Sequence, residues 1–280
     1  MPIIYYSPCC KAVNLMMNNT FRALPTDHPF MIDEYSFQKE LSCKAKGIEI
    51  HVAQFDQQSF DDNLFDITNV YCPIAITQSV DKRKAEYFAG RYLVARELQN
   101  RGFSHQRLEQ NVDRSLRLPN DVIGSISHSN DLATVAVLPS SNVNRENIGI
   151  DIQHLISSEV CNDIENMVAT VQEVDLVVRY GLTRTEAVTL LFSAKEAIYK
   201  ALARFVRRGL DFNSATLIEI DKGTVQFALS KDITSQIFDS EGDNDSRSVI
   251  CLYDYLAQQN AYLTVCYCSA DIHSDDFVLI

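Results

Sequence analysis

Long apolar runs are missing from this 280-residue sequence, although hydrophobic residues make up 46% of it. A membrane-spanning helix needs about 18 or more consecutive apolar residues, so no transmembrane segment is expected. The N-terminal stretch (residues 1–17) has no positively charged start ahead of its apolar residues. We therefore expect no signal peptide.

Several common motifs are also missing. No Cys-x-x-Cys pair occurs among the 8 cysteines, which argues against a structural zinc site. The scattered cysteines are typical of buried free thiols in a reducing cytoplasm, and this predicts a cytoplasmic protein. No GxGxxG or Walker-type loop is present, so neither of those nucleotide-binding folds is supported.

Basic residues are scarce: 25 Lys and Arg stand against 37 Asp and Glu, a net charge of −12. This balance argues against nucleic-acid binding and against a polybasic membrane anchor. Residues 81–117 differ from the rest of the chain in charge, because they contain nine basic and five acidic residues, a local charge of 9 − 5 = +4. The asymmetry indicates one anionic partner at one place, although a solvated helix face would show the same pattern.

Hydrophobic periodicity predicts a mixed α+β fold rather than a βαβ series. A helix is expected over residues 81–98, where Tyr87, Val94 and Leu98 share one face. A second helix is expected over residues 184–205, opened by a Thr183–Glu186 capping box. Strands are expected at residues 122–127, 133–138, 148–152, 215–220, 224–229, 248–253 and 261–268.

Three groups of residues could carry chemistry. Residues 124–129 (GSISHS) place His128 at a strand end, where it could donate to an anionic ligand or simply cap a turn. Asp151 sits inside an apolar strand, where a carboxylate needs a cation or donors. Glu196 and Lys200 share a helix face, and with Asp151 they could bind Mg²⁺ and phosphate, or form only a surface ion pair.

Four motifs occur in a fixed order: KRKAEYFAGR at 82–91, IGSISHS at 123–129, GIDI at 149–152 and FSAKEAIYKA at 192–201. Together they resemble the 4′-phosphopantetheinyl transferases, specifically the enterobactin synthetase component D type. The resemblance begins near Phe55 and covers about residues 54–270.

The resemblance implies that the chain transfers the phosphopantetheine arm of coenzyme A to a serine of an apo carrier-protein domain. Adenosine 3′,5′-bisphosphate would be released, and Mg²⁺ would be required. It also implies two similar α+β halves about a pseudo-twofold axis, residues 1–147 and 148–280, with coenzyme A between them. An extra segment would occupy about residues 1–53, and the fused halves would suit a monomer.

Site roles follow from the same resemblance. Arg83 and Arg91 are expected to contact coenzyme A phosphate or adenine, and Ser127 and His128 to contact phosphate. Asp151, Gln153 and Glu196 are the expected metal ligands. Lys200 would contact the pyrophosphate, and Glu196 or a metal-bound water would accept the proton of the incoming serine.

Gln153 is a departure from the family pattern, which commonly has a carboxylate two residues after the strand aspartate. An amide oxygen is a neutral and weaker Mg²⁺ ligand. One alternative is therefore a non-catalytic module that binds coenzyme A or carrier proteins. Another is the same reaction on fatty-acid or polyketide carriers instead of siderophore peptide synthetases. Arg204, Arg207 and Arg208 are a candidate carrier-docking patch.

Overall fold

The computed structural model describes residues 21–39, 47–103, 108–111, 115–206, 210–237 and 247–269. Within these ranges the chain forms two antiparallel sheets. The strand order is β1-β2-β4-β3 in the first sheet and β5-β9-β8-β7-β6 in the second. The strands are β1 (Met31–Lys39), β2 (Ile48–Phe55), β3 (Val122–Ser129), β4 (Leu132–Pro139), β5 (Glu146–His154), β6 (Ala215–Asp221), β7 (Thr224–Leu229), β8 (Ser248–Leu256) and β9 (Ala261–Ser269).

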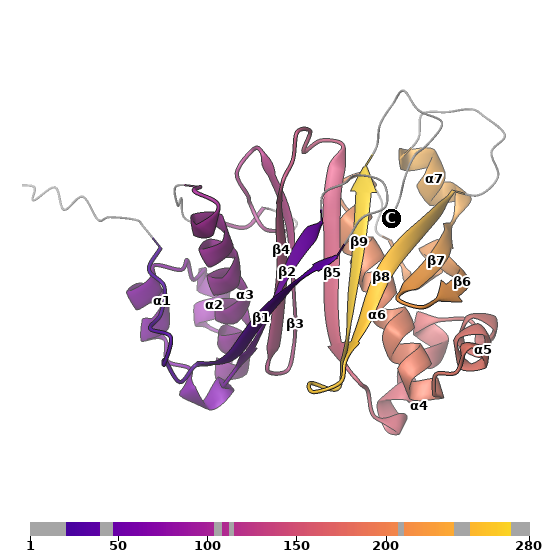
Figure 1. Cartoon of the computed structure of the whole chain (residues 1–280), viewed down its shortest axis with the longest axis horizontal. Helices are drawn as coiled ribbons and strands as arrows, with labels where there is room; N and C mark the ends of the chain where they lie inside the picture. Colours follow the sequence, from indigo (N-terminus) through magenta and orange to yellow (C-terminus); the bar gives the residue numbers. More distant parts are fainter. Residues whose placement is uncertain are drawn as a thin grey trace, which may run out of the picture.

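Each sheet carries one long helix on its outer face, so that the two sheets lie between α3 and α6 (Figure 1). The smaller helices cluster around these two. The helices are α1 (Asn63–Thr68), α2 (Ile74–Thr77), α3 (Asp81–Asn100), α4 (Ser158–Val168), α5 (Val171–Tyr180), α6 (Arg184–Leu202) and α7 (Lys231–Ile237). This arrangement confirms the expected α+β class.

Buried apolar side chains of the described residues form three clusters that match these layers. One lies between α3 and the first sheet, one between the two sheets, and one between α6 and the second sheet. The alternation of strand side chains explains the division, because successive residues point to opposite faces. Thus Ile148, Ile150 and Ile152 of β5 face the first sheet, which leaves Gly149, Asp151 and Gln153 on the α6 side.

Most elements expected from the sequence are present. The capping box at Thr183 and Glu186 begins α6 as predicted. The helix ends at Leu202 rather than at residue 205, because residues 203–205 continue as turns. The expected stop signal, Gly209, lies outside the described residues. Strands β1 and β2 and helices α1, α2, α4, α5 and α7 were not predicted.

The two sheets meet along β3 and β5, which are edge strands of different sheets. Serine side chains join these strands. Ser125 Oγ accepts a hydrogen bond from the backbone N–H of Ile150 (3.1 Å), and Ser129 Oγ accepts one from the N–H of His154 (3.2 Å). The hydroxyls therefore satisfy donors at the β5 edge that would otherwise be unpaired.

Two further properties were expected from the sequence. Five free cysteines lie in the described ranges, and four of them, Cys161, Cys251, Cys266 and Cys268, are buried. None of the helices in those ranges has the length and apolar character that crossing a membrane requires.

Candidate active site

Asp151 lies at the centre of the candidate site, on the face of β5 that packs against α6. Its side chain is only 7% exposed. Oδ1 accepts hydrogen bonds from Ser127 Oγ and from Lys200 Nζ, both at 2.7 Å. Oδ2 is buried and has no hydrogen-bond partner within the described chain. A buried carboxylate oxygen without a donor is costly, so this atom is suited to a cation.

Gly149 brings α6 close enough for these contacts. A Cβ atom at this position would lie 1.9 Å from the carbonyl oxygen of Ala197 and 2.5 Å from the backbone nitrogen of Ala201. Only glycine allows the two backbones to approach in this way. From the same helix Lys200 Nζ reaches the carbonyl oxygen of Ile150 (3.1 Å) as well as Asp151.

Glu196 lies one turn before Lys200 on α6 and is half-buried. Burial raises the pKa of its carboxyl group above the ordinary value, while the Lys200 charge opposes the shift and the Asp151 charge adds to it. The Glu196 carboxyl group is therefore near enough to Asp151 and Lys200 for their charges to act on it. A carboxylate with a raised pKa is a better proton acceptor near neutral pH.

Gln153 follows Asp151 on the same face of β5. Its amide Nε2 donates to the carbonyl oxygen of His154 at 3.2 Å. The amide group is therefore anchored through nitrogen, which leaves the amide oxygen as the ligand atom that this residue could offer.

His128 connects this site with α3, because it points to the opposite side of β3 from Ser127. Arg83 Nη1 lies 2.8 Å from His128 Nε2, and Glu86 Oε2 lies 3.7 Å from Nδ1. An arginine only donates, so Nε2 accepts and the ring is neutral. Burial lowers the pKa of His128, with Arg83 and Lys200 acting in the same direction and Glu86 and Asp151 opposing them.

Arg91 has a different environment. It is 6% exposed, its guanidinium lies 5.1 Å from the centre of the Tyr87 ring, and its Nη1 is buried without a hydrogen-bond partner in the described chain. Burial lowers its pKa, and Tyr87 opposes this shift. Arg83 is thus connected with the Asp151 site through His128. Arg91, which is also a residue of α3, is instead packed into the core.

The local positive charge of residues 81–117 is partly neutralised in the fold. Acidic residues distant in the sequence pair with several of its cations, as Lys84 does with Asp62 (2.8 Å), Arg101 with Glu49 (3.1 Å), and Arg96 with Glu34. Composition alone could not reveal this pairing. The side chain of Arg83 is 47% exposed, which leaves it open to an anionic ligand.

Ser125, Ser129 and Lys195 were not assigned roles from the sequence. The period-two spacing of Ser125, Ser127 and Ser129 is the signal that could have identified the β3–β5 contact. Lys195 pairs with Glu173 at 2.8 Å, and both side chains are almost fully buried (4% and 3% exposed). It therefore anchors α6 next to Glu196 rather than facing a ligand.

The fold and the site define an α+β protein in which a buried carboxylate, a lysine and a neutral histidine converge where two sheets meet. Comparisons with known proteins identify it further. The family model for the 4′-phosphopantetheinyl transferase N-terminal domain matches residues 73–138. That for the 4′-phosphopantetheinyl transferase superfamily matches residues 147–253.

Curated relatives agree with these matches. The chain is 30% identical to the enterobactin synthase component D of Escherichia coli O157:H7 over 159 residues, which cover 55% of this chain and 71% of the relative. It is 31% identical to the enterobactin synthase component D of Salmonella typhimurium over 176 residues, which cover 62% of this chain and 70% of the relative.

The chain therefore belongs to the 4′-phosphopantetheinyl transferase superfamily. It is a 4′-phosphopantetheinyl transferase, and enzymes of this family use coenzyme A as the donor and carrier-protein domains as acceptors. The alternative of a non-catalytic binding module finds no support in these matches.

Proposed function

We propose that this enzyme transfers phosphopantetheine to peptidyl carrier domains of a siderophore synthetase of the enterobactin type. The relatives named enterobactin synthase component D support the pathway. The observation that carries the chemistry is the buried, unpartnered Oδ2 of Asp151 beside Lys200 and Glu196.

The residues present fit Mg²⁺. This ion prefers oxygen ligands and is usually held by one or two carboxylates, with water and substrate phosphate completing the shell. Asp151 Oδ2 supplies an uncommitted oxygen, Glu196 a nearby carboxylate and Gln153 an amide oxygen. When bound, the ion would neutralise charge on the pyrophosphate.

The phosphate groups of coenzyme A would be held by donors from both sides of the β3–β5 contact. We assign Lys200 to the pyrophosphate, and Ser127 and His128 to phosphate oxygens. Arg83 is a phosphate or adenine contact, because its guanidinium is exposed next to His128. Arg91 is proposed as a further contact, and its unpartnered Nη1 is consistent with a ligand acceptor.

Glu196 is proposed as the general base. The serine hydroxyl oxygen of the carrier attacks the phosphorus that bears the pantetheine arm, and its proton passes to Glu196. The bond from that phosphorus to the bridging oxygen breaks, and adenosine 3′,5′-bisphosphate leaves. Lys200 donates to the pyrophosphate oxygens as negative charge develops on the leaving group.

The carrier domain would approach the second sheet. An open hollow beside Glu196 is lined in part by Tyr199, Leu210, Phe212 and Leu229, and its apolar character suits a carrier helix. In the arginine patch expected from the sequence, Arg204 Nη1 donates to the carbonyl oxygen of Val143 at 2.8 Å. Arg207 and Arg208 lie outside the described residues.

Intact-mass spectrometry of an apo peptidyl carrier domain incubated with the protein, coenzyme A and Mg²⁺ tests this function. We expect a gain of one phosphopantetheine mass that is absent with EDTA. Parallel reactions with fatty-acid and polyketide carriers decide the pathway, because faster modification of those carriers would refute the siderophore assignment. Coenzyme A binding without transfer to any carrier would refute the catalytic proposal.

A further inference from the structure

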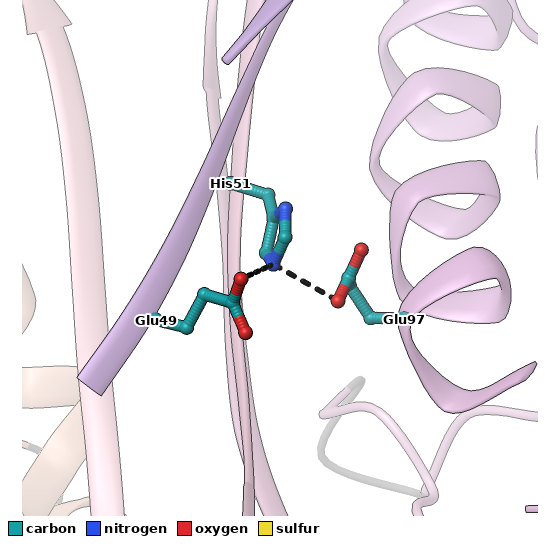
Figure 2. Close-up of side chains that lie close together, drawn as sticks. All are labelled: Glu49, His51 and Glu97. Carbon is teal, nitrogen blue, oxygen red and sulfur yellow. Dashed lines mark ion pairs between the residues drawn. The ribbon is translucent and has the colours of Figure 1, made fainter. Parts of the chain in front are cut away.

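A histidine and two glutamates converge in the first sheet, away from Asp151. Glu49 and His51 are two residues apart on β2, so they share the strand face that packs against α3. Glu97 lies in the last turn of α3 and is 3% exposed. Figure 2 shows the His51 ring between the two carboxylates, with the strand on one side and the helix on the other.

The contacts in this group are arranged around His51 Nε2. This atom lies 2.9 Å from Glu97 Oε2 and 3.7 Å from Glu49 Oε1. Nε2 is buried, and its approach to Glu97 does not have hydrogen-bond geometry. One oxygen of each carboxylate therefore faces the same ring nitrogen without a directional hydrogen bond to it.

The second oxygen of each carboxylate is held by another donor. Arg101 Nη2 lies 3.1 Å from Glu49 Oε2, and Asn100 Nδ2 lies 3.5 Å from Glu97 Oε1. Donors in these positions orient a carboxylate and leave its other oxygen free to bind, as is typical of the groups behind metal ligands.

The charge of the cluster also favours a cation. Three carboxylates, Glu34, Glu49 and Glu97, are paired with two guanidinium groups, Arg96 and Arg101. With a neutral His51 the formal sum is −3 + 2 = −1. The Glu97 carboxylate of this group is almost fully buried, and a proton on the imidazole or a metal ion would stabilise it.

We propose that Glu49, His51 and Glu97 form a second cation site, specific for a divalent transition metal such as Zn²⁺. The three ligand atoms all lie within 4.8 Å of one another. Ligands about 2.0–2.1 Å from a tetrahedral zinc ion lie roughly 3.3–3.4 Å apart, so shifts of about 1 Å would complete the triad. A water would take the fourth position.

The ligand set separates this site from the one at Asp151. Imidazole suits zinc, whereas Mg²⁺ prefers oxygen ligands alone. A metal here would clamp the end of α3 to β2, on the helix whose first turns carry Arg83 and Glu86. The proposal does not depend on the proposed transfer reaction.

Zinc binding to the full chain tests the proposal directly. The protein is stripped with chelator, kept reduced, and titrated with Zn²⁺ in competition with a chromophoric chelator. We compare the wild type with Glu97→Gln and His51→Ala. The matched control is Glu34→Gln, which removes a carboxylate of the same cluster that is not one of the three ligands.

We expect the wild type and Glu34→Gln each to bind one zinc equivalent with similar affinity. In Glu97→Gln and His51→Ala the zinc affinity should be lower by about tenfold or more. The cysteines are unchanged in every variant, so zinc held by thiols cancels in the comparison. Zinc should also raise the melting temperature of the wild type and of Glu34→Gln only.

Equal zinc affinity in Glu97→Gln and the wild type would overturn the proposal. So would a wild type that takes up no zinc, since the site would then hold a proton only. If His51→Ala fails to fold, Glu49→Gln replaces it, because Glu49 has a 39% exposed side chain and the change keeps its shape.

Discussion

Replacement of Asp151 by Asn removes one charge from the centre of the site and nearly preserves the shape of the side chain. Ser127 Oγ can still donate to the remaining amide oxygen at the Oδ1 position. Lys200 loses its ionic partner but keeps the carbonyl oxygen of Ile150, and its side chain is 26% exposed, so it can reach solvent. The substituted amide nitrogen takes the place of Oδ2, which has no donor in the described chain.

Asp151→Asn should raise the stability of the metal-free protein, although it lowers the transfer rate. A buried unsatisfied neutral group costs about 1–3 kcal/mol, and a charged one costs more. Without metal we therefore expect Asp151→Asn to be more stable by about 1 kcal/mol, which is a rise of roughly 2–4 °C in melting temperature for a chain of this size.

The transfer rate should fall steeply in the same variant. A metal ion contributes several kcal/mol to stabilising charge at phosphorus, and about 1.4 kcal/mol is a factor of ten, so the loss should be on the order of 10³-fold. Saturating Mg²⁺ at a hundred times its dissociation constant should stabilise the wild type by about 2.7 kcal/mol and leave Asp151→Asn unchanged.

Melting curves in EDTA and in a Mg²⁺ series, together with carrier modification followed by mass, measure these effects. Asp131→Asn is the control, because Asp131 pairs with His154 (3.3 Å) at the same β3–β5 contact but is not joined to Lys200. Three results would refute the reasoning: near-normal transfer by Asp151→Asn, stabilisation of that variant by Mg²⁺, or a much lower melting temperature in EDTA.

Three further changes have defined outcomes. Gln153→Glu should keep or raise transfer and lower the Mg²⁺ concentration needed for half-maximal rate; a large loss of rate would contradict a ligand role. Lys195→Met leaves the buried Glu173 without its cation and should cost about 3–5 kcal/mol in denaturant unfolding, part of which Glu173→Gln should recover. Because the folded-state pKa of His128 lies below 6.5, its protonation opposes folding, so stability should fall as pH drops below about 6.5. Melting temperatures between pH 7.5 and 5.5 should show a smaller decline in His128→Gln, and parallel curves would rule out this residue as the cause.

Helix α6 and most strands could be predicted because each shows its own periodicity, whereas α3 is buried around its whole circumference and has no single apolar face. The α3 prediction is correct in its start at Asp81, and the capping box at Thr183 correctly begins α6. By contrast, β2 was missed although Ile48, Ile50 and Val52 alternate with Glu49 and His51, which is the pattern of a half-buried strand. Their polar side chains are accommodated only because α3 and Arg101 face them, and the local sequence does not contain that information.

The candidate site was likewise predicted only in part from the sequence. Motif order pointed to Ser127, His128, Asp151, Glu196 and Lys200, and the structure places these residues together. Their chemical roles stay predictions until transfer is measured. The expected division of the chain near Asn147 also stays a prediction; that residue is the second of β5, and its amide donates to the carbonyl oxygens of Lys200 and Ala201.

The sequence by itself determined the α+β class, the capped helix that carries Glu196 and Lys200, and the strand that carries Asp151. These features depend on periods and spacings of a few residues, which are local. Only the tertiary structure decided which oxygen of Asp151 is left without a donor, which cations of residues 81–117 are already paired, and that Glu49, His51 and Glu97 meet. Each of these depends on groups far apart in the chain, since burial and charge pairing are set by the packing of whole layers.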